Sequence, residues 1–347
     1  MDTSSVMNNT HSTLDTLFTQ HYIDLAAERV GGETLACSDD FFAEMENLLK
    51  PGRGVFIADK YTERGKWMDG WESRRSYGRQ NGRDFDWCTI RLGIPGKIRG
   101  FDIDTNHFRG NAPQSISIEA CVSRGSLDED TEWVELLPPT AVEAHSQNLF
   151  SIENDARWTN VRLRMFPDGG IARFRVYGDP SFNAEQFLPG ELIDLAFVKN
   201  GGRALLCSDM FFSDKNNLLM PGRGVNMGDG WETKRRRDPG PDWSLVKLAA
   251  QGTIRKVLID TAHFKGNFPD RFSLQGCSGS DAAAIGNHLQ WHTIIPETQL
   301  FANREHLFQE EIICAAEQSF THVRLNIFPD GGVSRMRVFG HLQGPSE

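Results

Sequence analysis

Two histidines sit in closely matched sequences that combine several groups able to do chemistry. His107 follows Asp104-Thr-Asn and precedes Phe-Arg-Gly-Asn, and His263 follows Asp260-Thr-Ala and precedes Phe-Lys-Gly-Asn. An imidazole changes charge near neutral pH, so each ring can serve as general acid or base, or bind a metal ion when neutral. A purely structural role, in which the ring caps a strand end through a backbone carbonyl, is the alternative. We expect catalytic roles for both histidines and for Asp104 and Asp260.

Two glutamates also occur in a repeated motif, Asp-Gly-Trp-Glu. Glu72 closes the first copy and Glu232 the second. A neighbouring indole can shield a carboxylate from water and raise its pKa, which suits acid–base catalysis. The alternative is a surface ion pair with the nearby Arg74 or Lys234. We count both glutamates among the candidate catalytic residues.

Further polar residues stand where turns and strand ends are expected. A guanidinium fork matches a carboxylate in a bidentate manner, and carboxylates and amides accept from N–H groups. The candidates for substrate binding are Arg53, Arg74, Arg109, Asn111, Asp39 and Asp86. The chain has no phosphate-binding loop, HExxH, GxSxG or Cys/His zinc spacing. No cofactor is predicted with certainty, and a divalent metal ion stays open because Asp, Glu and His can gather around one without any linear spacing.

The whole chain is built twice. LACSDDFF at 35–42 recurs as LLCSDMFF at 205–212, and TNVRLRMFPDGGIARFRVYG at 159–178 recurs as THVRLNIFPDGGVSRMRVFG at 321–340. Solenoid repeats are roughly 20–50 residues long. A unit of about 155 residues is therefore a duplicated domain. The first copy carries about ten extra residues in IADKYTERGKWM.

The repeats give the domain boundaries. We expect a flexible N-terminal segment over 1–22, a first repeat over 23–179, a linker over 180–191 and a second repeat over 192–347. The linker is predicted from its two prolines and its lack of periodic pattern.

Within each copy the hydrophobic pattern has a period of two residues. Val161, Leu163 and Met165 alternate with Arg162 and Arg164, and a Pro-Asp-Gly-Gly turn follows. Alternation of this kind indicates half-buried strands, and many short strands separated by turns indicate a sandwich or jelly roll. The predicted fold class is all-β, with two tandem jelly-roll domains.

Composition excludes several classes of protein. The 347 residues hold 37 Lys and Arg against 47 Asp and Glu, a net charge of −10. Nucleic-acid binding depends on basic residues that neutralise phosphates, so no nucleic-acid partner is expected. No apolar run approaches the roughly 20 residues that span a bilayer, so no membrane association is expected. The first residues lack a signal-peptide pattern, and six cysteines without a C-x-x-C pair are typical of reduced thiols, so we expect a cytoplasmic protein.

These motifs carry a resemblance to the allantoicase family over nearly the whole chain, from Ile23 to Gly340. Its most specific parts are CSDDFF, NLLKPGRGV, MDGWESRR, GFDIDTNHFRGNAP and RLRMFPDGGIARFRVYG. The resemblance implies two jelly rolls akin to galactose-binding-like sandwiches, and hydrolysis of allantoate to ureidoglycolate and urea. It also implies a homo-oligomer, with metal dependence attributed to some members. The second copy changes MDGWESRRSYGRQNG to GDGWETKRRRDPG, so whether both repeats form equivalent sites stays open.

The chemistry of allantoate assigns roles to the candidates. Its carboxylate needs a cationic clamp, for which Arg74 or Arg109 would serve. The departing urea needs an acid such as His107 or Glu72, and a carboxylate such as Asp104 can orient water. The alternative function is a non-catalytic tandem carbohydrate-binding module, because fold alone does not imply function and the eight tryptophans could line a sugar groove.

Overall fold

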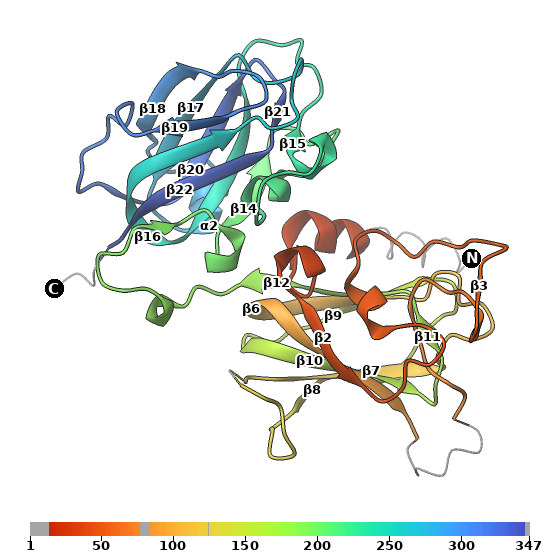
Figure 1. Cartoon of the computed structure of the whole chain (residues 1–347). Coiled ribbons are helices and arrows are strands. Elements are labelled where there is room, and N and C mark those ends of the chain that lie inside the picture. Colours follow the sequence, from red (N-terminus) through yellow and green to blue (C-terminus); the bar gives the residue numbers. More distant parts are fainter. Residues whose placement is uncertain (1–13, 77–83, 124, 344–347) are drawn as a thin grey trace, which may run out of the picture. The chain divides into compact units, whose positions relative to one another are not determined.

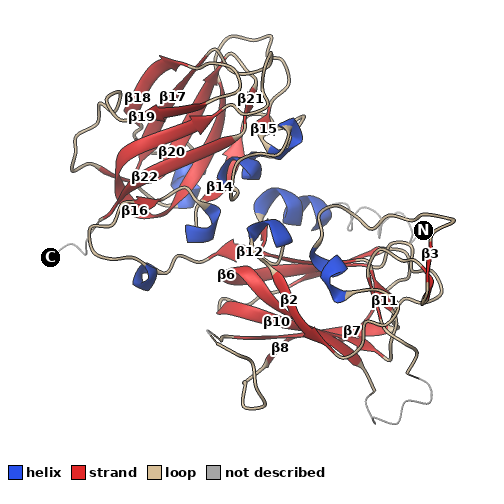
Figure 2. Cartoon of the chain, viewed as in Figure 1, coloured by secondary structure: helices blue, strands red, loops and turns tan. Residues whose placement is uncertain are grey.

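A computed structural model describes residues 14–76, 84–123 and 125–343 of the chain (Figure 1). The chain divides into two compact units, Met1–Asp179 and Pro180–Glu347. Both units consist mainly of strands joined by loops and short helices, as Figure 2 shows. The predicted all-β class with two tandem sandwich domains is confirmed. No helix in the described ranges is long and apolar enough to cross a membrane.

The first unit contains one hydrogen-bonded set of eight strands in the order β1-β12-β6-β10-β7-β8, with β2 and β9 also paired to β6. A second, two-stranded sheet joins β5 to β11, and a third joins β3 to β4. The elements are β1 (Ile23–Asp24), η1 (Glu28–Val30), β2 (Glu33–Cys37), η2 (Met45–Leu49), β3 (Tyr61–Thr62), β4 (Gly65–Lys66), β5 (Trp71–Glu72), β6 (Asp86–Asp104), β7 (Ser115–Cys121), β8 (Val134–Ala141), β9 (Gln147–Ser151), β10 (Arg157–Phe166), β11 (Gly170–Ile171) and β12 (Arg173–Pro180).

Strand β6 passes from one layer of the sandwich to the other. Against β10 its register jumps from Arg91 to Gly96, which leaves a corner at residues 92–95. Asp86, where β6 begins, pairs with Met165, and the carbonyl of Asp104, where β6 ends, accepts from the N–H of Ala172. Both ends of β6 therefore lie beside the turn that joins β10 to β12. We call this part of the first unit its loop end. The matching part of the second unit, where Asp242 pairs with Ile327 and the carbonyl of Asp260 accepts from Ser334, is the loop end of that unit.

The second unit repeats this topology in the order β13-β22-β16-β20-β17-β18, with β14 and β19 paired to β16. Its elements, after η3 (Ala184–Gln186), are β13 (Ile193–Asp194), η4 (Val198–Asn200), β14 (Arg203–Cys207), η5 (Lys215–Leu219), η6 (Met227–Asp229), β15 (Trp231–Glu232), β16 (Asp242–Asp260), β17 (Arg271–Cys277), α2 (Asp281–Ile285), β18 (His292–Gln299), β19 (Glu305–Phe308), β20 (Ser319–Phe328), β21 (Gly332–Val333) and β22 (Arg335–Leu342). The duplication seen in the sequence is thus a duplication of structure.

A buried phenylalanine supports the loop end of each unit. Phe108 is fully buried, and its ring lies so close to Gly70 and Gly170 that a Cβ at either position would clash with it. Phe264 occupies the same place against Gly230 and Gly332 in the second unit. The glycines of the Asp-Gly-Trp-Glu and Pro-Asp-Gly-Gly motifs are therefore required by packing, and this packing fixes the backbone beside each glutamate.

The N-terminal segment departs in part from the expectation that residues 1–22 are flexible. Residues 14–21 form a helix, and its Phe18 is 1% exposed. The Phe18 ring stacks on Tyr177 at 5.4 Å and covers Gly100, where a Cβ would lie 2.2 Å from it. The correction applies to 14–21 only, because residues 1–13 lie outside the described part of the chain.

Candidate functional site

The candidate residues of the first repeat all lie at the loop end of the first unit. Two of them, Arg53 and Asp104, form an ion pair. Arg53 donates from Nε and Nη2 to the two oxygens of Asp104, at 2.9 and 2.7 Å. The backbone N–H of Asn106 also donates to Asp104. Asp104 is 2% exposed, whereas Arg53 is exposed. Both oxygens of Asp104 are thus engaged, so its carboxylate positions Arg53 and the chain after β6.

Glu72 lies in β5 beside the Pro-Asp-Gly-Gly turn. Asn111 donates from Nδ2 to its Oε1 at 2.8 Å, and the backbone of Glu72 pairs with Gly170. Burial raises the pKa of the Glu72 carboxyl above its ordinary value, and the hydrogen bond from Asn111 opposes part of that rise. The alternative of a surface ion pair with Arg74 is wrong, because Arg74 bonds Asp39 instead.

Asp39, Arg74 and Asp86 form the side of the loop end nearest the start of β6. Arg74 donates from its backbone N–H and its Nε to the Asp39 carboxylate at 2.8 and 2.7 Å, and these bonds hold the pKa of Asp39 below its ordinary value against the opposing effect of burial. Asp86 is fully buried and accepts from the hydroxyl of Ser38 at 2.7 Å. These bonds hold the backbone after β2 against the segments that contain Arg74 and Asp86.

His107 stands on the loop that follows β6 and has a left-handed backbone, with φ of 71°. Such a conformation is uncommon for residues other than glycine, and functional sites are among the places that retain it. Its ring stacks on Phe56, with centroids 5.6 Å apart. The carbonyl of Gly54 is bonded by the side chain of Asn106. Within the described residues, no hydrogen bond engages the ring nitrogens of His107.

Sequence reasoning missed His145, which lies between β8 and β9. Its Nδ1 accepts from the backbone N–H of His107 at 2.9 Å, and its Nε2 lies 2.9 Å from Nη2 of Arg109. Partial burial, together with the cations of Arg109 and its neighbours, lowers the pKa of His145 below its ordinary value. No repeated motif marks this histidine, because Asn303 stands in its place in the second unit.

The second unit has the same ion pair and the same bond to its glutamate as the first, but the ring of its histidine has a different hydrogen-bond partner. Arg223 bonds Asp260 at 2.9 and 3.2 Å, and Asn267 donates to Glu232. The ring of His263, however, bonds the carbonyl of Gly224 through Nε2 at 2.7 Å. The structural alternative considered for both histidines therefore describes His263.

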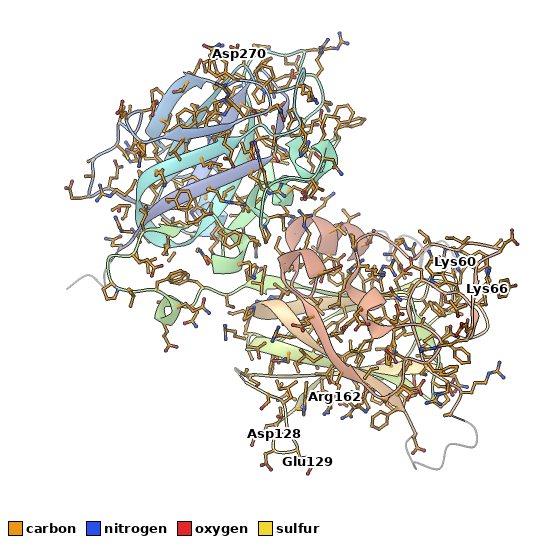
Figure 3. All side chains as sticks on the ribbon, viewed as in Figure 1. Lys60, Lys66, Asp128, Glu129, Arg162 and Asp270 are labelled. Carbon is orange, nitrogen blue, oxygen red and sulfur yellow. The ribbon has the colours of Figure 1, made fainter. Side chains whose placement is uncertain are left out.

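The loop between η2 and β5 also differs. In the first unit, the additional residues carry Lys60, whose ammonium lies 3.7 Å from the ring centroid of Trp67, and Lys66, whose ammonium lies 4.8 Å from that of Phe56. Figure 3 shows both lysines on this loop. Lys66 also donates to the carbonyl of Ile57 at 2.7 Å, which fastens the loop that supports the ring stacked on His107.

A divalent metal ion would need several free oxygen or nitrogen ligands at one point. Among the described residues there is no group of three or more His, Cys, Asp and Glu side chains arranged to hold one. The candidate carboxylates are instead bonded to Arg53, Arg74 and Asn111. These residues therefore do not fit a resident metal ion.

Comparisons with known proteins cover nearly all of both repeats. A sequence profile described as "Allantoicase repeat" matches residues 23–181 and 193–343. A probable allantoicase 1 of Burkholderia mallei is 48% identical over 329 residues, which are 94% of this chain and 96% of that protein. An allantoicase of Dictyostelium discoideum is 46% identical, over 91% of this chain and 86% of that protein.

Solved structures agree with these sequence matches. The crystal structure of allantoicase from Saccharomyces cerevisiae covers 95% of this chain and 97% of its own, with 36% identity and a TM-score of 0.75. The similarity therefore extends through both sandwiches and includes the motifs that form their loop ends. On this sequence and structural evidence, the chain belongs to the allantoicase family.

Proposed function

We propose that the loop end of the first repeat is where this chain carries out the reaction of its family, the hydrolysis of allantoate to ureidoglycolate and urea. Full-length similarity to allantoicases supports the activity and does not favour the alternative of a carbohydrate-binding module. One observation carries the choice of repeat: the ring of His263 is bonded to a backbone carbonyl, whereas no hydrogen bond within the described residues engages the ring of His107.

The reaction requires one acid and one base. Allantoate has a central carbon that bears a carboxylate, a hydrogen and two ureido groups. Hydrolysis breaks the bond from this carbon to one ureido nitrogen, which gains a proton and leaves as urea. A water oxygen bonds to the same carbon and loses a proton. The two proton transfers balance, so the protein needs only to deliver one proton and accept another.

His107 and Glu72 fit these two roles. The imidazolium of His107 donates the proton to the departing urea, because its ring nitrogens are open to a ligand at the surface of the loop end. The carboxylate of Glu72 accepts the proton of the attacking water, because burial makes it a stronger base than an exposed glutamate. Asn111 holds Glu72 in place through Oε1, and we assign the second oxygen to the attacking water.

The remaining candidates position the site. Asp104, expected from the sequence to act as a base, is bonded through both oxygens to Arg53, and we assign both residues to shaping the loop after β6. Asp39 and Arg74 are assigned to holding the chain beside Glu72. In the second repeat we assign His263, Glu232 and Asp260 to structural roles only, through their bonds to Gly224, Asn267 and Arg223, and we expect no turnover there.

Release of urea from allantoate tests the proposal. The measurement compares the full chain with the variants His107→Asn and His263→Asn, each with and without EDTA. We expect release by the full chain and by His263→Asn, and loss in His107→Asn. Equal loss in both variants would contradict a single active repeat. Loss after chelation that is restored by Mn²⁺ would place an ion in the reaction and contradict the conclusion that these residues do not fit a resident metal ion.

The chain is also proposed to be a cytoplasmic homo-oligomer, in which the second repeat contributes to assembly. Phe211, Phe212 and Val225 at the loop end of the second unit are 70%, 61% and 76% exposed. In the first unit the corresponding Phe41 is 39% exposed and lies against the guanidinium groups of Arg64 and Arg74. Exposed apolar side chains of this kind favour contact with another protein surface.

A further inference from the structure

The two ring nitrogens of His145 both face hydrogen-bond donors. Its Nδ1 lies 2.9 Å from the backbone nitrogen of His107, and its Nε2 lies 2.9 Å from Nη2 of Arg109. The backbone of His145 is itself fixed, because its N–H donates to the carbonyl of Phe108 and its φ is 55°. The position of the ring is therefore set by the fold of the loop.

The protonation of this ring follows from its partners. A backbone N–H and a guanidinium N–H can both only donate, and a neutral imidazole has a single acceptor nitrogen, so it cannot accept from both. The N–H of His107 is held in place by the chain, whereas the side chain of Arg109 is exposed and can turn. We therefore take Nδ1 as the acceptor, which places the proton of the neutral ring on Nε2. The 2.9 Å between Nε2 of His145 and Nη2 of Arg109 thus joins two donors with no acceptor between them. Arg109 is exposed, and no ion pair within the described residues engages it.

We propose that Arg109 and the Nε2–H of His145 form a binding site for the carboxylate of the substrate. A carboxylate accepts from both donors at once, and its negative charge relieves the contact between them. The inference rests on the proposed function, because it takes the substrate to be allantoate. The carboxylate of allantoate is attached to the reacting carbon, so its capture at this pair holds that carbon beside His107, whose backbone bonds the same imidazole.

The second repeat lacks this donor pair. Asn303 takes the place of His145 and accepts from the backbone N–H of His263 at 2.8 Å, and Lys265 takes the place of Arg109. Asn303 keeps the loop in the same left-handed conformation, with φ of 51°. The bond that shapes the loop is therefore present in both repeats, whereas the pair of a guanidinium and an imidazole N–H is found only in the first of the two described loops.

Kinetics of allantoate hydrolysis test the binding site. Arg109→Gln removes the charge and the fork, and we expect kcat/KM to fall about 100-fold, mostly through KM, because charge-assisted hydrogen bonds are lost. His145→Asn keeps the bond to His107, as Asn303 does in the second repeat, and is expected to raise KM about 10-fold. Lys265→Gln and Asn303→Ala serve as matched controls in the second repeat and should leave both constants unchanged. A KM within about twofold of the parent value in Arg109→Gln and His145→Asn would overturn the proposal.

Binding of a simple carboxylate gives a second readout that does not depend on turnover. In the full chain, ¹⁵N NMR of the imidazole of His145 should show the proton on Nε2, and glycolate should shift that signal, with the shift abolished in Arg109→Gln. A proton on Nδ1, or no response to glycolate, would contradict the carboxylate site even if allantoate is hydrolysed. A glycolate response in a chain that releases no urea would support the site and contradict the proposed function.

Discussion

The loop ends of the two repeats share their ion pairs and differ around the histidine. Arg53 and Asp104 in the first repeat correspond to Arg223 and Asp260 in the second, with the same bidentate geometry. In the first repeat Asn106 bonds the carbonyl of Gly54, and in the second repeat Ala262 stands at that position. The corresponding carbonyl, that of Gly224, is then bonded by the ring of His263.

Under the proposed function, the two copies of the duplicated domain share a loop structure, and only the first acts on the substrate. The amide of Asn106 satisfies a carbonyl that would otherwise attract the neighbouring imidazole, so the ring of His107 can meet a ligand. In the second repeat, where alanine stands at this position, the ring of His263 bonds the carbonyl instead. Recurrence of a polar residue in both copies is therefore evidence for a shared loop structure, and our proposal that the first repeat is the active one rests on the partners that differ between the copies.

The largest expected effect separates the two histidines. His107→Asn should lower kcat by about 10²–10³-fold, the scale of a lost general acid. His263→Asn should change kcat by less than about twofold, because its ring bonds only a backbone carbonyl. Steady-state kinetics of both variants measure the ratio, and comparable losses would show that the repeats contribute equally.

The second largest expected effect is on kcat in variants of Glu72, whose equivalent in the second repeat is Glu232. Glu72→Gln should lower kcat by about 10²-fold. As a base, Glu72 must be ionised, so activity of the parent enzyme is lost as pH falls through its pKa. Burial raises that pKa, so the acid limb of kcat/KM should lie above the ordinary range of a glutamate. This acid limb of the pH profile of kcat/KM should be absent in Glu72→Gln and present in Glu232→Gln. An unchanged acid limb in Glu72→Gln would show that Glu72 is not the base.

Much of the fold could be predicted from the sequence because its signals are local and occur twice. The alternation of Val161, Leu163 and Met165 identified β10, and all three side chains are fully buried. The helix over 14–21 was missed because its sequence is not repeated: at the matching positions of the second unit only the short η3 forms, and Leu188, which corresponds to Phe18, is exposed. Its burial depends on Gly100, more than 80 residues away, and position 256 of the second repeat is a lysine.

The site could be predicted only in part. The raised pKa of Glu72 was expected from its sequence, although Trp71 is buried in the core and the shielding comes from burial in general. The partners of Asp104 and Arg74 depend on chain segments that are 51 and 35 residues away. His145 could not be identified from the sequence, because the second repeat has asparagine at that position and the motif around it is not repeated.

Asp102 of the first repeat corresponds to Leu258 of the second in the alignment of strands β6 and β16. Asp102 is 4% exposed, and burial raises its pKa to about 7. The folded state therefore holds a proton that the unfolded state releases near pH 4, so stability falls as pH rises from about 4 to about 7 and is then level. The difference between the two pKa values corresponds to about 4 kcal/mol, and this figure already includes the hydrogen bond from Gln147, which lowers the pKa of Asp102.

The variant Asp102→Leu copies the second repeat. It should raise the free energy of unfolding by about 2–3 kcal/mol at pH 8 and have little effect at pH 4, where the carboxyl is neutral in the folded state. Denaturant unfolding at the two pH values measures this, and Asp102→Asn serves as the polar control. A gain of equal size at both pH values would show that packing, and not ionisation, is responsible.

The smallest effect tests the claim that the two ion pairs are equivalent. Asp104→Asn and Asp260→Asn each weaken a bidentate bond to an exposed arginine, and each should lower the free energy of unfolding by about 1–2 kcal/mol. Because Asp104 is bonded through both oxygens, its substitution should leave the kcat of allantoate hydrolysis within about threefold of the parent, as should that of Asp260. Urea unfolding and saturating-substrate kinetics on the same preparations give both quantities. A collapse of kcat in Asp104→Asn alone would make Asp104 a participant in the reaction, and would mean that identical ion pairs serve chemistry in one repeat and structure in the other.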